Sequence, residues 1–513
     1  MPNSLSRKKS LLATIDLGAH SCRMLIAEYD PRNKKEEVLE ELSVSVPLGA
    51  DVFRLGVISN ASILMLCGIF RNFREKLNEY GVKNYRAIAT SAVREAQNAE
   101  VLLERIRHAT GIELKIFEGG DEARLDYLTV MNELPQNFGF YKKSAIIVDI
   151  GTGACQISCY KKGTLTHTET IKLGTLRMLD QIRGTVSART IRECLIPIIN
   201  KAFNELRQIA PDIKSSCIIA MGSSVRTLLC LFRQNNGQGR EQLRKISRED
   251  FEQRIAETQK LSLENLLDQY DIPYDSGEAV IPCSIILENL FHITGAKTLL
   301  APTITMKEAL LHDFIRELQH QEDGFTRQIE EFVLQTALKY RSDSTYIKRV
   351  ALFADKLFIQ LQNLHGCQAR AALLLRIAAL LHKTGLFINN QGYHKHSGYI
   401  INSMELPGIS PAERNIIAVT ARFHRKATPS AKHAEFLALE SNERSLVMKL
   451  SALLRIACGL AESCRSVTQF KVCLNPDSVQ LTPSADLAMS GFELLKQDVD
   501  WFSQVFAIPL LVR

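Results

Sequence analysis

A short hydrophobic run that ends in an aspartate and a glycine turn stands out in the pattern of this chain. Residues 145–148 are apolar and lead into Asp149, followed by the turn Gly151-Thr152-Gly153 and a second run with β character at 157–160. A short apolar run bounded by glycines is typical of a buried strand. The stretch therefore predicts a β-hairpin.

The same pattern occurs near the N-terminus. Residues 11–15 are mostly apolar, Asp16 and Gly18 follow, and a strand-like run continues at 24–29. Repetition of one structural unit along a chain indicates a duplicated architecture. The two hairpins therefore predict two related lobes that face one cleft.

Strand-like and helical stretches alternate around the two hairpins. Such alternation predicts an α/β domain with a mixed sheet. Residues 233–245 are polar and contain glycine, which predicts an exposed loop. We expect strands at 38–46, 86–90, 113–117, 166–172 and 217–221, and helices at 61–80, after Asn98 as N-cap, and at 118–131, 188–209, 248–270 and 281–294.

The residue pattern changes at about residue 315, beyond which glycine is rare and helical periodicity dominates. The helix at 368–383 is apolar nearly all round, so we expect it at the centre of this part. Ser410-Pro-Ala-Glu413 combines an N-cap, a proline at N1 and a capping-box glutamate, which is a specific helix start. The predicted domains are lobe I (1–130), lobe II (131–314), a helical domain (315–466) and a small α+β domain with strands at 470–474 and 479–481 and a helix at 491–504 (467–513).

Composition limits the class of protein. A chain of 513 residues is too long for one core. Its 63 basic and 56 acidic residues leave a net charge of +7, which permits a polyanionic ligand where the charge clusters. The 12 cysteines have no zinc-site spacing, so we expect reduced thiols in a cytoplasmic protein. We expect neither a transmembrane segment, because no apolar run reaches roughly 18 residues, nor a signal peptide.

The turns and a second motif are candidates for phosphate chemistry. Glycines let backbone N–H groups approach an anion, and an aspartate at a strand end can hold a hydrated cation. Gly119-Gly-Asp-Glu122 lies at a predicted helix start, where a carboxylate beside a phosphate cleft could deprotonate a water. Arg94, after a strand and turn, suits phosphate. A structural role is the open alternative for each of these groups.

Basic residues gather in three stretches of the helical part. They could form a groove for an extended polyanion, although a solvated basic face is the commoner arrangement. No aromatic platform accompanies the charge, so we expect no nucleic acid, and no nearby carboxylate completes a metal site. The residues are Lys383, which follows His382, then His394, Lys395 and His396, and finally Arg422, His424, Arg425 and Lys426.

Several segments together resemble the Ppx/GppA family of exopolyphosphatases and guanosine pentaphosphate phosphohydrolases. They are ATIDLGAHS, ATSAVREAQN, GIELKIFEGGDEARL, VDIGTG and AMGSS, in the order of the family. The helical part resembles the HD-like C-terminal domain of the long exopolyphosphatases. The resemblance covers nearly the whole chain. It implies an α/β fold with two actin-like (ASKHA, ribonuclease H-like) lobes, an all-α HD-like domain, a small α+β C-terminal domain and commonly a homodimer.

The resemblance also implies an activity and roles for individual residues. The activity is Mg²⁺-assisted release of terminal orthophosphate from inorganic polyphosphate, with guanosine pentaphosphate as a further substrate of the family. By motif, Glu122 would be the general base, Ser91 and Arg94 would contact phosphate, and Asp16 and Asp149 would hold the metal and its waters. The basic residues of the helical part would line a polyphosphate channel. Phosphate would also be bound by Gly18, Gly151, Thr152, Gly153, Gly222 and Ser223.

Departures from the family pattern lead to a second hypothesis. Ala154 lacks a phosphate-binding hydroxyl, Gln156 replaces a carboxylate, and residues 303–309 are a reduced form of a family motif. A neutral amide can orient a water but cannot accept its proton. The His-Asp pair of the HD-like domain is His382-Lys383 in this chain. Since the aspartate is replaced by a lysine, we expect no metal-dependent HD phosphohydrolase activity. The alternative to an active enzyme is therefore a catalytically weakened member that binds polyphosphate or guanosine pentaphosphate as a regulator.

Overall fold

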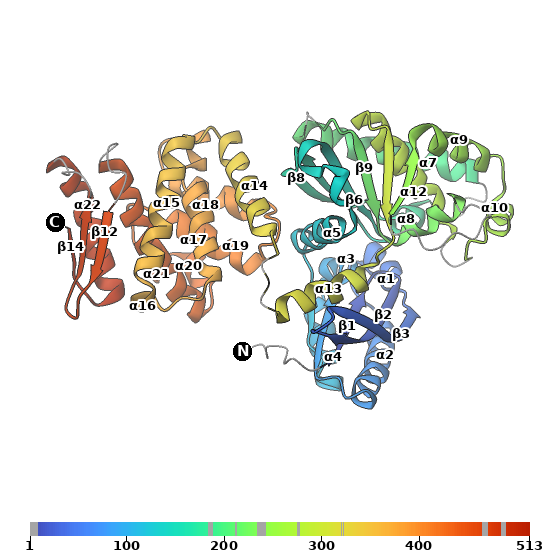
Figure 1. Cartoon of the computed structure of the whole chain (residues 1–513), viewed down its shortest axis with the longest axis horizontal. Coiled ribbons are helices and arrows are strands. Elements are labelled where there is room, and N and C mark those ends of the chain that lie inside the picture. The colour runs from blue at the N-terminus through green and yellow to red at the C-terminus, as the bar shows by residue number, and fades with distance from the viewer. Residues whose placement is uncertain are drawn as a thin grey trace. The chain divides into compact units, whose positions relative to one another are not determined.

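The computed structural model describes residues 9–182, 188–210, 213–232, 243–273, 277–319, 321, 323–463, 470–483 and 489–512. The chain divides into two compact units, residues 1–326 and 327–513 (Figure 1). The eleven cysteines in these ranges are free thiols. Within the same ranges, no helix has the length and apolar character needed to cross a membrane.

The first unit contains two sheets with the same core topology. In the first sheet the strand order is β3-β2-β1-β4-β5, with β1 antiparallel to β2 and parallel to β4. In the second sheet, β8-β7-β6-β9-β11 repeats this order and these directions, and β10 is added antiparallel to β11. The duplication that the two hairpins predict is thus confirmed. The strands are β1 (Ser10–Leu17), β2 (Ser21–Asp30), β3 (Lys35–Ser45), β4 (Asn84–Ala89), β5 (Leu114–Ile116), β6 (Ser144–Ile150), β7 (Cys155–Lys161), β8 (Thr164–Ile171), β9 (Cys217–Met221), β10 (Leu243–Ser247) and β11 (Thr298–Pro302).

The second sheet differs from the sequence expectation at one edge. The prediction of a loop at 233–245 is wrong for its last residues, because β10 begins at Leu243 and pairs with β11. Residues 233–242 lie outside the described ranges. The backbone pairing of β10 is long-range, so the polar local composition of this segment did not reveal it.

The two hairpins have an aspartate at equivalent positions. Asp16 lies opposite Arg23 in the β1–β2 pair, and Asp149 lies opposite Gln156 in the β6–β7 pair. Each aspartate is the last but one residue of its strand. Because the sheets share their topology, the duplication presents two aspartates at matching ends of two sheets.

Helices bury both faces of the first sheet. One core joins its inner face to α2 (Asn60–Glu79) and α4 (Ala99–Thr110). On the other face, Leu311 and Ile315 of α13 (Met306–Leu318) pack on β1 and β2, and Leu125 of α5 (Gly119–Glu133) packs near Ile88. The chain therefore returns to lobe I after it has completed lobe II, which the residue pattern did not indicate.

The second sheet is covered by its own helices. The long helix α7 (Ala188–Ile209) packs against α12 (Val280–Thr294), whose buried residues join the core of this lobe. Helix α5 also contacts β6, β7 and β8, so it touches both sheets. The remaining helices of this unit are α1 (Leu48–Leu55), α3 (Ser91–Glu95), α6 (Thr175–Gln181), α8 (Ser223–Leu228), α9 (Arg248–Thr258) and α10 (Leu263–Gln269).

The second unit is a helical domain with a small α+β end. Helix α17 contacts α15, α19 and α21, which confirms its predicted central position. The predicted start at Ser410 is also confirmed, because its hydroxyl accepts from the Glu413 N–H and the Glu413 carboxylate accepts from the Ser410 N–H. The elements are α14 (Phe325–Lys339), α15 (Ser344–Gln360), α16 (Gln362–His365), α17 (Arg370–Leu381), α18 (Tyr393–Ser403), α19 (Pro411–Arg422), α20 (Ala434–Leu437), α21 (Ser441–Ser463), β12 (Phe470–Leu474), β13 (Val479–Pro483), α22 (Met489–Phe506) and β14 (Leu510–Val512).

Candidate functional site

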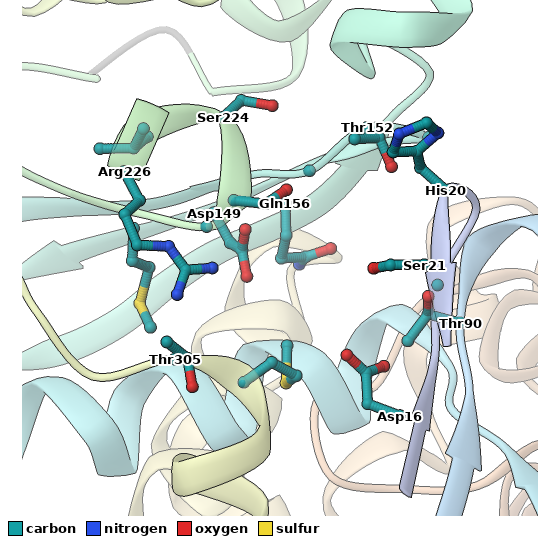
Figure 2. A pocket seen from close by; sticks show the side chains of 18 of the residues that line it. Asp16, His20, Ser21, Thr90, Asp149, Thr152, Gln156, Ser224, Arg226 and Thr305 are labelled. Carbon is teal, nitrogen blue, oxygen red and sulfur yellow. The ribbon is translucent and has the colours of Figure 1, made fainter. Parts of the chain in front are cut away.

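A cleft of about 190 Å³ lies between the two lobes of the first unit and is lined by both hairpin turns (Figure 2). The structure thus brings together segments that are more than a hundred residues apart. Among the residues singled out from the sequence, those that line the cleft are Asp16, Gly18, Ser91, Glu122, Asp149, Gly151, Thr152, Gly153, Ala154, Gln156, Gly222 and Ser223, together with Thr303, Ile304, Thr305, Met306 and Ala309 of the segment 303–309.

The two turns are closed in the same way. The Gly18 N–H donates to the Ser21 carbonyl at 2.9 Å, and the Gly151 N–H donates to the Ala154 carbonyl at 3.0 Å. The second turn is further fixed by the N-terminus of α6, because the Thr175 N–H donates to the Gly151 carbonyl at 3.1 Å. Both turns are therefore held by backbone hydrogen bonds before any ligand binds.

Two glycines of lobe II are required by close approach. A Cβ on Gly222, whose φ is +104°, would lie 2.2 Å from the Oδ1 atom of Asp149. A Cβ on Gly153 would lie 2.3 Å from the Ser91 Oγ atom of lobe I. Any side chain at either position would displace a polar group of the cleft.

Glu122 is buried in the first turn of α5 and is held by Arg94 of lobe I. The Arg94 Nη1 atom donates to Glu122 Oε1 at 3.0 Å and also to the Phe117 carbonyl. Arg94 is not among the described residues that line the cleft. Its described hydrogen bonds go to the Glu122 carboxylate, which it orients, and to the Phe117 carbonyl, and its predicted contact with phosphate stays a prediction.

Four carboxyl groups of the described residues line the cleft, and one of them, Asp126, is not among the predicted site residues. Burial raises the pKa of Asp16. Burial and the negative charges of Glu122 and Asp16 raise the pKa of Asp149 to about 7. Asp126, one turn after Glu122 on α5, also lines the cleft, and burial followed by the charges of Asp149 and Glu122 raises its pKa well above the usual range. Asp126 looked like an ordinary helix residue because nothing in its local pattern shows what it faces.

Two arginines on opposite lobes offset part of this negative charge. Arg23 of β2 and Arg226 of α8 both line the cleft, and Figure 2 shows the Arg226 guanidinium beside Asp149. The positive charge of Arg226 acts to lower the pKa of Asp149, against the larger effect of burial. Neither arginine is among the predicted site residues, although the hairpin register places Arg23 directly opposite Asp16.

Gln156 is fixed as a neutral group in the cleft wall. Its Nε2 atom donates to the Thr168 hydroxyl at 2.8 Å, and its Oε1 atom accepts from the Thr170 hydroxyl at 2.5 Å. Both partners belong to β8, so the amide orientation is defined by the sheet. The position that the family resemblance associates with a carboxylate therefore carries no charge here.

The oxygen donors of the cleft fit the Mg²⁺ that the resemblance implies. No group of three or more His, Cys, Asp or Glu side chains within the described ranges is arranged to hold a metal ion. Mg²⁺ binds through one or two carboxylates and completes its shell with water and substrate phosphates. Asp16 and Asp149, with oxygen donors that line the cleft, fit such an open site.

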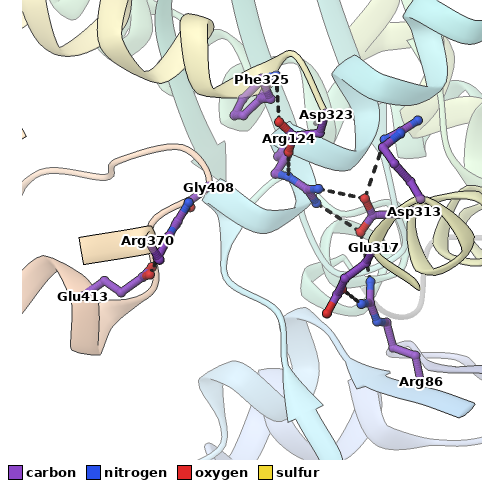
Figure 3. A network of polar contacts seen from close by, with 10 residues as sticks. Arg86, Arg124, Asp313, Glu317, Asp323, Phe325, Arg370, Gly408 and Glu413 are labelled. Carbon is purple, nitrogen blue, oxygen red and sulfur yellow. Dashed lines mark hydrogen bonds and ion pairs between the residues drawn. The ribbon is translucent and has the colours of Figure 1, made fainter. Parts of the chain in front are cut away.

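Ion pairs hold the elements around the cleft. Arg177 of α6, which is 8% exposed, binds both carboxylate oxygens of Glu95 of lobe I and donates from Nε to the Gly153 carbonyl at 2.7 Å. Figure 3 shows Arg124 of α5 bound to Asp313 of α13, with distances of 3.1 and 2.7 Å. On helix α5, Glu122 thus faces the cleft, while Arg124 anchors the helix to α13.

The basic residues of the second unit gather around His394. His394 is 8% exposed, and burial together with the positive charges of Lys426, Arg422, Arg425 and Lys395 lowers its pKa to about 4. Lys395, Arg425 and Lys426 are exposed, and His396 is half-buried. The predicted cluster is therefore a real concentration of charge in the folded unit.

Three members of the predicted channel have other partners in the structure. Lys383 donates to Glu462 at 3.0 Å and lies over the Tyr346 ring at 3.7 Å. His424 is buried, and its ring contacts the Ala421 carbonyl at 2.7 Å. Arg422 pairs with Glu435. These contacts give the three residues structural roles in addition to any contact with a polyanion.

Comparison with known proteins agrees with the fold. A model of the Ppx/GppA phosphatase family matches residues 26–315, and one of Ppx/GppA phosphatase domain III matches residues 330–486. A guanosine-5'-triphosphate,3'-diphosphate pyrophosphatase of Aliivibrio fischeri is 23% identical over 434 residues, 82% of each chain. The protein of the same name from Vibrio atlanticus is 23% identical over 515 residues, 96% of this chain and 97% of the relative.

Two solved structures resemble the chain in fold. The Ppx/GppA family member of Aquifex aeolicus superposes with a TM-score of 0.52 at 18% identity and covers 61% of this chain and all of its own. An exopolyphosphatase from Cytophaga hutchinsonii superposes with a TM-score of 0.53 at 19% identity and covers 62% of this chain and 99% of its own.

Proposed function

Because this chain belongs to the Ppx/GppA phosphatase family, we propose that it removes the terminal orthophosphate from inorganic polyphosphate and also acts on guanosine pentaphosphate. The observation that carries the proposal is the buried Glu122, held by Arg94 at a cleft that both glycine turns line. A carboxylate fixed beside an anion-binding turn can orient and deprotonate a water. The names of the relatives and structural neighbours support both substrates.

In the proposed reaction, the terminal phosphate lies between the two turns. The turn 151–153, Gly18, Gly222, Ser223 and Ser91 bind its oxygens, and Arg23 and Arg226 offset its charge. Glu122 takes a proton from a water whose oxygen attacks the terminal phosphorus. The P–O bond to the rest of the chain breaks, orthophosphate leaves, and the shortened polyphosphate carries away the bridging oxygen. Preorganised charge of this kind is the largest contribution to phosphoryl transfer.

A divalent cation fits this proposal. Asp16 and Asp149 would hold it, and when bound it would neutralise charge on the phosphate oxygens. Arg94 acts through Glu122, whose carboxylate it orients by the 3.0 Å hydrogen bond.

The basic cluster around His394 is proposed to bind more distant phosphates of a long polyphosphate. Its exposed cations are Lys395, Arg425 and Lys426. Reversing these three charges is expected to weaken long-chain binding while short substrates are unaffected. Unchanged binding of long chains would remove this part of the proposal. The homodimer, the HD-like character of the helical domain and the cytoplasmic location implied earlier stay predictions.

The neutral Gln156 keeps the second function open. A member with a weakened centre would bind polyphosphate or guanosine pentaphosphate without hydrolysing it. The hydrogen bonds of Gln156 to Thr168 and Thr170 favour this candidate, because they fix the orientation of an amide that cannot accept a proton from water.

Orthophosphate release separates the two functions. Wild type, Glu122→Gln and the control Glu133→Gln, at the opposite end of α5, are compared on long-chain polyphosphate and on guanosine pentaphosphate with Mg²⁺. We expect release from wild type, a decrease of about 100-fold or more in Glu122→Gln, and no change in the control. Tight binding without release from wild type would establish the regulator instead, and equal release from Glu122→Gln would refute the assignment of the base.

A further inference from the structure

Asp126 is a buried acid for which the fold provides no compensation. It is 1% exposed, and its Oδ1 atom has no hydrogen-bond partner within the described part of the chain. An unpartnered buried carboxyl group costs several kcal/mol relative to a paired one. A purely structural position on this helix would be expected to carry an apolar residue, as Leu125 and Leu128 beside it do.

The position of Asp126 relates it to the reaction centre. It follows Glu122 by four residues, so both side chains lie on one face of α5, and both line the cleft. Helix α5 packs against β6 and β7, the strands that carry Asp149 and Gln156. The negative charges of Asp149 and Glu122 both act on Asp126.

Asp126 supplies a carboxyl group to the same cleft in which Gln156 supplies only a neutral amide. The amide of Gln156 lines the same cleft and is bonded on both sides by threonines of β8. The wall made by α5 and β7 therefore has a carboxyl group on the helix and none at this strand position. Mg²⁺ sites need carboxylate oxygens but only one or two of them.

We propose that Asp126, together with Asp149, supplies the carboxylate oxygens that bind a divalent cation at this centre, in place of the acidic side chain that position 156 lacks and in preference to the pair Asp16 and Asp149 that the resemblance implies. The inference rests on the proposed function only for the location of the substrate phosphates. The bound cation would offset the like charges of Asp126, Asp149 and Glu122, which otherwise repel one another. It also accounts for the unpartnered Oδ1 atom.

Metal binding and thermal stability test the proposal without turnover. Wild type, Asp126→Asn and the exposed control Asp268→Asn are titrated with Mn²⁺ by calorimetry, alone and with inorganic phosphate, and are melted with and without Mg²⁺. We expect Asp126→Asn to weaken Mn²⁺ binding at least tenfold, to lose most of the Mg²⁺-dependent rise in melting temperature, and to melt above wild type without metal. Wild-type behaviour is expected of the control.

A second variant distinguishes a metal ligand from a merely structural acid. Asp126→Asn/Gln156→Glu returns a carboxylate to the same wall and is expected to recover Mn²⁺ affinity to within a few-fold of wild type. Mn²⁺ affinity that is unchanged in Asp126→Asn, no Mn²⁺ binding by wild type, or a melting temperature below wild type without metal would each overturn the proposal. If wild type binds Mn²⁺ through Asp126 but releases no phosphate, the proposed function fails while this inference stands.

Discussion

Arg177 links the two lobes through Glu95 and Gly153, and its removal is expected to destabilise the first unit. Its guanidinium binds the Glu95 carboxylate at 2.6 and 3.1 Å and the Gly153 carbonyl at 2.7 Å, and it lies over the Phe53 ring at 3.9 Å. Arg177→Met keeps the volume but removes every polar contact. Breaking one partner of a buried ion pair costs about 3–5 kcal/mol.

The contacts of Glu95 place the expected loss at the lower end of that range. Glu95 retains 25% side-chain exposure, and Lys172 lies 3.4 Å from it, so part of its charge stays compensated. We therefore expect Arg177→Met to lower the free energy of unfolding by about 3 kcal/mol. At roughly 2–4 °C per kcal/mol, the melting temperature should fall by about 6–12 °C.

A double-mutant cycle measures the ion pair itself. Thermal and urea unfolding are compared for Arg177→Met, Glu95→Gln and the double variant, with the exposed Arg189→Met as control. A coupling of about 1.5 kcal/mol or more is expected for a charge-assisted bidentate pair. A coupling below about 0.5 kcal/mol, or a loss no larger than that of Arg189→Met, would refute the claim that this contact holds the lobes together.

Three further predictions follow from single contacts. In Gly222→Ala the new Cβ would lie 2.2 Å from Asp149 Oδ1 on a backbone with φ of +104°, so the melting temperature should fall more than in Gly295→Ala, where a Cβ meets open space. Equal falls in melting temperature would show that the Asp149 side chain moves away easily. Asn98→Ala should cost about 2 kcal/mol in urea unfolding, because its side chain bonds both the N–H and the carbonyl of Ile58. The folded His394 has a pKa of about 4, below its unfolded value of about 6.5, so stability is full above pH 6.5 and falls by up to about 3 kcal/mol toward pH 4. His394→Gln should flatten acid unfolding curves in this window, and unchanged curves would contradict the assignment.

Much of the fold could be predicted because its signals are local. The apolar runs before Asp16 and Asp149, the periodicity of α2 and α17 and the capping box at Ser410 each depend on residues close in sequence. Helix α4 begins after Asn98 as expected, but the Asn98 side chain bonds Ile58 and does not cap the helix. The position was right, and its physical reason was wrong.

The rest depends on contacts between distant segments. Strand β14 has three residues, and β11 is identified only by its pairing with β9 and β10. At the site, Glu122 and the turns carry recognisable motifs, whereas Asp126 and Arg226 are ordinary helix residues until the fold places them at the cleft. A helical pattern shows which face a residue shares, but not what that face meets.

The return of α13 to the first sheet has a consequence for the order in which the protein is made. Leu311 and Ile315 cover the face of β1 and β2 that bears Leu12 and Leu25. These strands leave the ribosome before the helix that shields them, which follows only after residues 144–302; that interval takes on the order of 10–30 s at roughly 5–20 residues per second. The first sheet is thus completed only after the second lobe has been synthesised. A fragment of the first unit that stops before Met306 would leave this apolar face open to water, so a fragment meant to contain the complete first sheet must extend through Leu318.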